Sequence, residues 1–232
     1  MRRRTFLLAM PAVAMSGCVS VGGAAGPPMP APVYKVGDQW VYNCSDGFRL
    51  PVVWQETHEV TAVDATGIAV RVTARGETVN FERVELLSSP GIVKIGSAYD
   101  PAETRTFVPP MERFQFPLTP NTQWTQNLRN RDPNNELMST INRFVRVGGY
   151  ETVSVPAGTF NAIVMRTLMS VDDNNPWRWP TDANYMTWFD ERVGNVVRMT
   201  LFAEYLERGD GMSAIKIRTQ NTVIVLASYR RA

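Results

Sequence analysis

Few side chains in this sequence could carry out acid–base, nucleophilic or metal chemistry, and they are widely spaced. His58 is the single histidine of the chain, and Glu56 and Glu59 are its nearest acidic neighbours in sequence. A structural zinc site needs about four ligands, and a serine triad would have to use His58 as its base. The chain has no Gly-x-Ser-x-Gly segment that could place a nucleophilic serine. We therefore predict no catalytic residue and no metal site, and we interpret the protein as a non-enzyme.

Two clusters of acidic and amide side chains could supply oxygen ligands or paired carboxylates. Asp172-Asp173-Asn174-Asn175 is rich in oxygen atoms, but it lacks the ligand spacing and the final glutamate of an EF-hand loop. Asp190-Glu191 could in principle act as an acid–base pair, but the turn residues Val193-Gly194-Asn195 follow it closely. We interpret both clusters as polar turns between strands, and we predict no cofactor.

The stretch Trp177-Arg178-Trp179-Pro180 lies in an expected loop and offers two different interpretations. Exposed aromatic residues on loops often bind glycans, peptides or lipid headgroups. Alternatively, the two indole rings fold back and cap the end of a sheet. Trp177, Arg178 and Trp179 are therefore candidate ligand-binding residues, with capping as the alternative.

The N-terminus offers another kind of chemistry, the covalent modification of a cysteine. Residues 1–17 have a basic start, a short apolar centre and small residues at the end, as secretory signals do. The apolar centre, Phe6–Met15, is shorter than the roughly 20 residues that span a bilayer. Met15-Ser16-Gly17-Cys18 resembles the bacterial lipobox, in which the cysteine sulfur receives a diacylglyceryl group. We predict a signal peptide over residues 1–17 and a lipid anchor (palmitate) at Cys18 that holds the protein on a membrane.

The residues around this site also bear on export and on the second cysteine. Val19 after Cys18 favours the outer membrane, with the domain facing the periplasm. The pair Arg3-Arg4 leaves both the Sec and the twin-arginine export routes open. Cys44 would have no disulfide partner once Cys18 is lipidated, so we interpret it as a small buried residue in a strand.

Charge and composition bound the partners and the domain organisation. The 24 basic and 22 acidic residues include three arginines of the signal, which leaves 21 basic residues and a net charge of −1 after their removal. A nearly neutral domain has no electrostatic footprint for nucleic acid, so we predict no nucleic-acid partner. Residues 18–33 are rich in Gly, Ala and Pro, which indicates a flexible linker after the lipidated cysteine. A single domain is expected over residues 34–232.

Apolar residues in this domain alternate with a period of two, which is typical of half-buried strands. Turn residues Asp64–Gly67 predict a hairpin between residues 52–63 and 68–75. Further strands are expected over 78–87, 92–98, 123–129, 138–147, 151–155, 160–171, 185–190, 195–207 and 213–228. The pattern predicts an all-β fold, an antiparallel curved sheet that forms a half-barrel or a barrel.

Three segments together resemble a group of uncharacterised bacterial envelope lipoproteins. They are Tyr34-Lys35-Val36-Gly37-Asp38-Gln39-Trp40, then Val153-Ser154-Val155-Pro156-Ala157-Gly158-Thr159-Phe160, then Thr187-Trp188-Phe189-Asp190-Glu191-Arg192-Val193-Gly194-Asn195-Val196-Val197. The sheets of that group in turn resemble the half-barrel of periplasmic lipoprotein carriers. The resemblance implies a fold and an envelope location, and it implies no catalytic residue.

The sequence is compatible with two functions, besides the weaker possibility of an envelope hydrolase. In the first, the membrane-anchored protein docks another envelope protein or the cell wall. In the second, the concave face of the sheet binds a lipid or another apolar ligand, as in the carriers. A ligand pocket would need about 300 Å³ or more. A docking domain would instead fill the same space with aromatic and methionine side chains.

Overall fold

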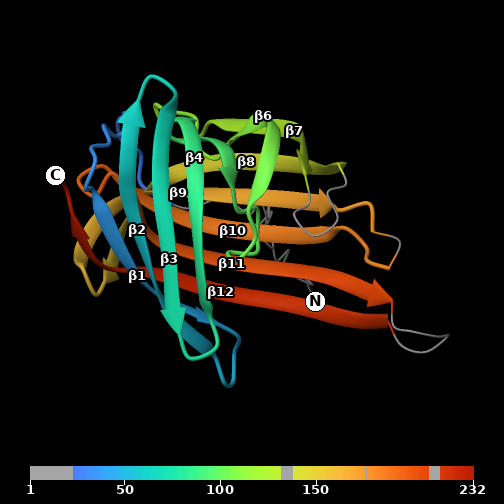
Figure 1. Ribbon diagram of the computed structural model, residues 1–232. Coiled ribbons are helices and arrows are strands. Elements are labelled where there is room, and N and C mark those ends of the chain that lie inside the picture. Colours follow the sequence, from blue (N-terminus) through green and yellow to red (C-terminus); the bar gives the residue numbers. More distant parts are fainter. Residues whose placement is uncertain (1–22, 132–137, 176, 209–214) are drawn as a thin grey trace, which may run out of the picture.

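Antiparallel strands form a barrel in the computed structural model (Figure 1). The structure describes residues 23–131, 138–175, 177–208 and 215–232. The strands within these ranges are β1 (Gln39–Asp46), β2 (Val52–Asp64), β3 (Gly67–Gly76), β4 (Asn80–Ser89), β5 (Ile92–Gly96), β6 (Arg105–Glu112), β7 (Gln123–Arg131), β8 (Met138–Val155), β9 (Gly158–Asp172), β10 (Thr181–Asp190), β11 (Asn195–Arg208) and β12 (Ile215–Arg230). In the described part of the chain, no helix is long and apolar enough to cross a membrane.

Each strand pairs with its neighbours in sequence, and the first strand pairs with the last. Trp40 of β1 lies opposite His58 of β2 on one side and opposite Tyr229 of β12 on the other. The β1–β12 pairing closes the sheet, so the expected all-β antiparallel fold is confirmed as a closed barrel. Closure removes the sheet edges, whose unpaired backbone groups would otherwise promote aggregation.

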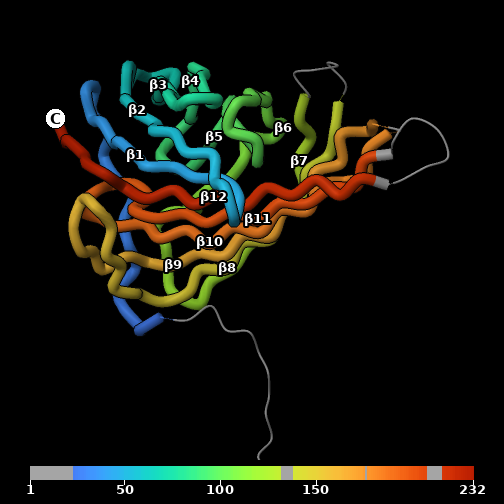
Figure 2. The backbone as a smooth tube through the Cα atoms, turned by 90° about the horizontal axis from the view of Figure 1, so that it is seen from below, coloured from blue at the N-terminus to red at the C-terminus, as the bar shows by residue number. Residues whose placement is uncertain are grey.

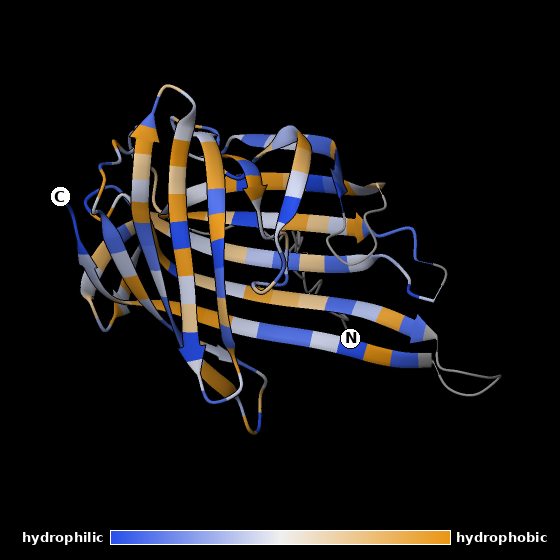
Figure 3. Cartoon of the chain, in the orientation of Figure 1, coloured by the Kyte–Doolittle hydropathy of each residue, from blue (hydrophilic) through white to orange (hydrophobic). Residues whose placement is uncertain are grey.

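The side chains alternate between the barrel interior and the outer surface, as the period of two requires. Figure 3 shows the result as alternating hydrophilic and hydrophobic bands along the long strands. Strand β4 inverts the usual polarity, because Arg83 and Glu85 are buried while Val84 and Leu86 are exposed. The register explains this inversion, since Arg83 and Glu85 pair with the buried Val72 and Val70 of β3 and so share their face.

Two features of the strands differ from the sequence-based prediction. Strand β6 was not expected, because Pro109 and Pro110 lie within it. Proline has no N–H to donate, but here β6 pairs with β7 only over Thr106–Val108, before the prolines. Strand β8 runs on between the two predicted strands at 138–147 and 151–155, with a bulge between Val147 and Tyr150. The turn expected at 208–212 lies largely outside the described residues.

The described part of the expected linker, from Gly23 on, is in contact with the barrel. Figure 2 shows this segment (blue) passing down to β8. Ala24 and Tyr150 exchange two backbone hydrogen bonds of 2.8 Å, and Met29 and Leu118 exchange another two of 2.8 Å. A Cβ atom on Gly149 would lie 2.3 Å from the Ala24 carbonyl oxygen, so glycine is needed for this close approach. The small residues that indicated a linker therefore also permit docking, which composition alone does not show.

The docked segment belongs to a second apolar cluster at one end of the barrel. Its buried members are Met29, Leu118, Val147, Ile163, Met165 and Phe189. Phe114 and Phe116 contact the Phe189 ring edge-on, with centroids 5.3 and 5.5 Å away. Such edge-to-face pairs add about 0.5–1.5 kcal/mol each to the effect of burial. This cluster closes one end of the barrel and leaves the central interior for the candidate site.

Candidate functional site

The barrel encloses an interior cavity of about 200 Å³. Apolar side chains form much of its wall, and they include Trp40, Leu87, Val93, Met111, Phe114, Met169, Met199, Leu201 and Ile224. Trp40 is fully buried, and its Nε1 donates a hydrogen bond of 2.9 Å to the Val193 carbonyl oxygen. The remaining space is smaller than the roughly 300 Å³ of a typical ligand pocket. Aromatic and methionine side chains therefore fill part of the interior.

Arg83, Glu85 and Arg113 form a charged triad on the cavity wall, where the polar side chains of β4 face inward. The carboxylate of Glu85 accepts hydrogen bonds from Arg83 Nη2 at 3.1 Å and from Arg113 Nη1 at 2.8 Å. Burial by itself would raise the pKa of Glu85, but the charges of Arg113 and Arg83 outweigh it and lower the pKa to about 2. Glu85 is therefore ionised in the folded protein at neutral pH and neutralises one of its two arginine neighbours.

His58 and Glu56 form a second polar pair on the same wall. His58 Nε2 lies 2.9 Å from Glu56 Oε2, and Trp54 Nε1 donates to Glu56 Oε1 at 2.9 Å. Burial raises the pKa of Glu56, but the hydrogen bond and charge of His58 together with Arg83 lower it overall. The ring of His58 also packs edge-on against Tyr42, with centroids 5.0 Å apart. Within the described ranges, no three His, Cys, Asp or Glu side chains are grouped as a metal site.

Arg143 is a third cation on the cavity wall, and its environment differs from that of Arg83 and Arg113. Its side chain is buried on the inward face of β8, where Nη1 donates to the Glu112 carbonyl oxygen at 2.9 Å. No carboxylate among the described residues forms an ion pair with it, and its Nε has no hydrogen-bond partner there. Burial, followed by the repulsion of Arg113, lowers the pKa of Arg143 to about 10. The guanidinium is thus a buried charge at neutral pH to which no carboxylate of the described residues bonds, and the charge of Glu112 offsets its burial only in part, which is unfavourable for folding.

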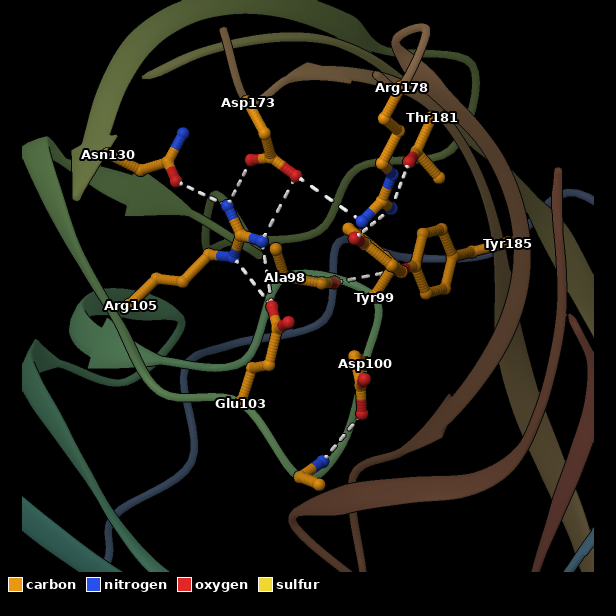
Figure 4. Close-up of polar contacts among 11 residues, drawn as sticks. Ala98, Tyr99, Asp100, Glu103, Arg105, Asn130, Asp173, Arg178, Thr181 and Tyr185 are labelled. Carbon is orange, nitrogen blue, oxygen red and sulfur yellow. Dashed lines mark hydrogen bonds and ion pairs between the residues drawn. The ribbon is translucent and has the colours of Figure 1, made fainter. Parts of the chain in front are cut away.

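A loop between β5 and β6, residues 97–104, enters the barrel and covers the cavity at the end opposite the docked segment; we call it the interior loop. Tyr185 Oη donates to the Ala98 carbonyl oxygen at 2.6 Å, and Arg83 Nη1 donates to the Pro101 carbonyl oxygen. Tyr99 is buried, and its hydroxyl accepts a hydrogen bond from Arg178 Nη2. Figure 4 shows the contacts of Tyr185 with Ala98 and of Arg178 with Tyr99 in the interior loop.

Arg105 anchors the base of the interior loop at the start of β6 (Figure 4). Its side chain is only 1% exposed, and its guanidinium donates to Asp173 Oδ1 at 2.6 Å, Glu103 Oε2 at 2.7 Å and Asn130 Oδ1 at 2.8 Å. Burial lowers the pKa of Arg105, but its bond to Asp173 and the charges of Glu103 and Asp173 raise it overall. The loop of residues 172–175 is therefore more than the polar turn that its sequence indicated, because Asp173 is buried in an ion pair.

The structure separates the three residues that the sequence offered as a ligand-binding group. Arg178 folds inward, donates to Thr181 Oγ1 at 2.6 Å and lies over the Tyr205 ring, 3.7 Å from its centroid. Trp177 and Trp179 are 63% and 53% exposed. Arg178 is thus held by contacts within the protein, while the two indole rings lie exposed on the surface and are not folded back as the capping alternative expected.

The other candidate residues within the described ranges have structural roles. Cys44 is buried in β1, as expected, and burial followed by the charge of Glu56 raises the pKa of its thiol. Asp190 caps the β10–β11 turn by accepting hydrogen bonds from the backbone N–H groups of Arg192 and Val193, as a turn residue does. Cys18, the predicted lipidation site, lies outside the described residues.

A second concave feature lies on the outer surface of the barrel, across β7 to β11, and was not identified from the sequence. This outer groove measures about 610 Å³ and is open to solvent. Phe144, Leu168 and Phe202 contribute its apolar side chains, and Leu168 and Phe202 are 42% and 43% exposed. They belong to one cross-strand row, because Phe144 pairs with Leu168 and Asn184 pairs with both Leu168 and Phe202. Apolar side chains of β8, β9 and β11 therefore lie on the outer face of the barrel, where the alternation of inward apolar and outward polar residues predicts polar side chains.

Comparisons with known proteins support the fold rather than an activity. No family model matches the chain, and no curated protein matches it. A structure from Bacteroides fragilis, described as an exported protein with a YmcC-like fold, has 14% identity and a TM-score of 0.51 over 88% of this chain and 100% of that one. A lipoprotein structure from Parabacteroides distasonis has 12% identity and a TM-score of 0.49 over the same shares. The hypothetical lipoprotein YmcC from Escherichia coli has 9% identity and a TM-score of 0.39 over 82% of this chain and 84% of that one.

Proposed function

We propose that this protein is a lipid-anchored protein of the bacterial cell envelope. Met15-Ser16-Gly17-Cys18 supplies the lipidation motif, after a short apolar segment preceded by three arginines. The fold likeness to the Bacteroides fragilis protein, which is described as exported, agrees with this location. A diacylglyceryl group carries two acyl chains, which suffice for stable membrane attachment. Attachment to the outer membrane and the likeness to lipoprotein carriers stay predictions.

The anchor is tested by metabolic labelling of the full chain with radioactive palmitate. Wild-type protein is expected to take up label and to sediment with membranes. Cys18→Ala should lose the label and leave the membrane fraction. Cys44→Ala is the matched control, because Cys44 is the second cysteine of the chain and lies buried in β1. Label retained in Cys18→Ala would contradict the lipid anchor at this residue.

We further propose that the anchored barrel is not an enzyme and docks another envelope protein through the outer groove. The observation that carries this proposal is the apolar row of Phe144, Leu168 and Phe202, in which Leu168 and Phe202 are exposed and Phe144 is half-buried. Exposed apolar surface rimmed by polar residues is typical of protein–protein contact sites. Asn127, Asn142, Asp182 and Glu204 supply such a rim. A cell-wall partner is less well matched, because the centre of the groove is apolar and a glycan would have to form its hydrogen bonds with the rim alone.

Site-specific photo-crosslinking in living cells tests the docking proposal. A photoreactive phenylalanine analogue at position 168 of the full chain is expected to give a discrete protein adduct. The same analogue at position 84 should give none, because Val84 is an equally exposed apolar residue on β4, outside the groove. Phe202→Glu should reduce the adduct from position 168 at least fivefold, since it places a charge in the contact. Equal adducts from both positions, or no adduct at 168, would count against docking at this groove.

The interior cavity favours a second function, the binding of an apolar ligand inside the barrel. Its wall is largely apolar, as such a site requires. Its volume of about 200 Å³ is too small for a whole membrane lipid while the interior loop stays in place. The second candidate is therefore the binding of a small ligand.

A further inference from the structure

We propose that the barrel interior binds a small organic monoanion, a carboxylate on an apolar body, and that Arg143 holds its carboxylate. The inference rests on the second candidate function, binding inside the barrel, and does not depend on docking at the outer groove. It names both the chemical class of the ligand and the residue that recognises it.

The first argument is the state of Arg143. Its side chain is 6% exposed, it lines the cavity, and no carboxylate of the described residues pairs with it. Its hydrogen-bond acceptors are oxygens of neutral groups, the Glu112 carbonyl at 2.9 Å and the Gln126 amide at 3.5 Å, and its Nε has no partner. The carboxylate of Glu112 favours the charged form without bonding to it, and burial outweighs this effect. A buried charge without a counter-charge is costly to the fold. An anionic ligand would supply the missing charge, and guanidinium groups bind carboxylates in a two-pronged geometry.

The second argument is the charge of the whole cavity wall. Its arginines are Arg83, Arg113 and Arg143, and its glutamates are Glu56 and Glu85. These arginines and glutamates, counted without His58, carry one positive charge more than they carry negative charges. Glu85 bonds to both Arg83 and Arg113, and the charge of Glu56 also acts on Arg83. No carboxylate of the described residues bonds to Arg143, so we assign the surplus to Arg143. A single negative charge on the ligand balances this surplus. A doubly charged phosphate would instead leave one net negative charge in the cavity, beside the two glutamates of the wall.

The third argument is the apolar remainder of the wall and the size of the cavity. Met169, Met199, Leu201 and Ile224 line it from β9, β11 and β12, and Tyr42 and Phe114 add aromatic surface. Among these groups the one hydrogen-bonding partner is the Tyr42 hydroxyl, which already donates to the Val196 carbonyl oxygen at 3.0 Å. Thr167, Thr187, Asn195, Gln220 and Thr222 also line the cavity, so its wall is largely but not wholly apolar. A space of about 200 Å³ fits a single ring or a short chain. The ligand is therefore a small amphiphile with one charged end.

Titration calorimetry on the purified full chain tests this inference with three probes: phenylacetate, hexanoate and octanoate. At least one is expected to bind, and the neutral amide of the same probe should bind at least tenfold more weakly. Inorganic phosphate should also bind more weakly than the carboxylate. No binding by any of the three carboxylates would overturn the proposal. An amide that binds as tightly as its carboxylate would also overturn it, while leaving apolar binding inside the barrel intact.

Substitution of Arg143 tests the assigned residue. Arg143→Gln should weaken carboxylate binding at least tenfold and leave amide binding unchanged. Arg146→Gln is the matched control, because Arg146 lies three residues along β8 and alternation places it on the outer face. Unchanged carboxylate affinity in Arg143→Gln would overturn the assignment. The comparison of carboxylate with amide uses the wild-type chain, so it remains decisive if the Arg143 variant does not fold.

Discussion

Replacing Arg105 by methionine is expected to lower the free energy of unfolding by about 3–5 kcal/mol, the range observed when one partner of a buried ion pair is removed. The guanidinium of Arg105 bonds to Asp173, Glu103 and Asn130. Its loss leaves the buried carboxylate of Asp173 with the more distant Arg178, 3.8 Å away. Methionine keeps much of the side-chain volume, so the change reports on charge and hydrogen bonding more than on packing.

Chemical denaturation followed by tryptophan fluorescence measures this loss. The matched control is Arg129→Met, because Arg129 lies on the exposed face of β7. Surface substitutions of this kind usually change stability by no more than about 0.5 kcal/mol. Because Arg105 holds the base of the interior loop, the variant should also show faster hydrogen exchange at residues 97–104. A loss in Arg105→Met no larger than that in Arg129→Met would show that the network contributes little to stability.

The Glu85→Gln substitution is expected to have a comparable effect that depends on pH. At neutral pH it removes the carboxylate shared by Arg83 and Arg113 and should cost about 3–5 kcal/mol. The folded pKa of Glu85, about 2, lies below its ordinary value of 4.5. Its ionised form therefore stabilises the fold fully above about pH 4.5, and this contribution disappears as the pH falls from 4.5 towards 2. At 1.36 kcal/mol for each pH unit, the stabilisation amounts to about 3 kcal/mol.

Urea denaturation at pH 7, 4.5, 3 and 2 tests this prediction. The wild-type chain should lose more stability than Glu85→Gln between pH 4.5 and 2, so the two curves should converge in acid. Glu82→Gln serves as the control, because Glu82 lies on the exposed face of the same strand, β4. Parallel curves for wild type and Glu85→Gln would mean that Glu85 titrates near its ordinary pKa in the folded protein. The triad would then be weaker than its geometry indicates.

Arg143 bears on stability in the opposite direction to Glu85. Its pKa of about 10 in the folded protein lies below the ordinary value of 12.5, so its charge is disfavoured by folding at every pH below about 10. The barrel interior thus holds two arginines that bond to a carboxylate, Arg83 and Arg113, and one, Arg143, to which no carboxylate of the described residues bonds. Buried charged groups that destabilise a fold are candidates for function. This favours Arg143 over Arg83 and Arg113 as the arginine that binds the ligand.

Local sequence patterns were sufficient for most of the strands and for several turns. The hairpin of β2 and β3 has nearly the predicted limits, because its turn is stabilised within itself: Asp64 Oδ1 accepts hydrogen bonds from the backbone N–H of Thr66 at 2.7 Å and from the Thr66 hydroxyl at 2.6 Å. The turn at Asp190–Gly194 is likewise made by contacts within five residues. Such features need no partner from elsewhere in the chain, so residue order alone could indicate them.

Barrel closure, by contrast, does not follow from the sequence pattern, which fits a half-barrel as well as a barrel. It depends on the pairing of β1 with β12, which joins residues such as Gln39 and Arg230 from opposite ends of the domain. The alternation of side chains with a period of two is the same whichever strand β1 pairs with, and whether the sheet closes or stays open. Only the accumulated twist and register of all the intervening strands bring these two together.

The candidate site was decided by tertiary structure for the same reason. Arg83-Val84-Glu85-Leu86-Leu87 alternates equally well with its charges inside or outside, so its sequence does not choose a face. The register with β3 turns Arg83 and Glu85 inward, and Arg113, distant in sequence, completes their ion pairs there. The sequence by itself determined the anchor motif, the all-β class and most strands, because these follow from neighbouring residues. The tertiary structure determined which charges face the interior and which of them have partners, since such partners come from other strands: Arg113 completes the ion pairs of Glu85, whereas no carboxylate of the described residues bonds to Arg143.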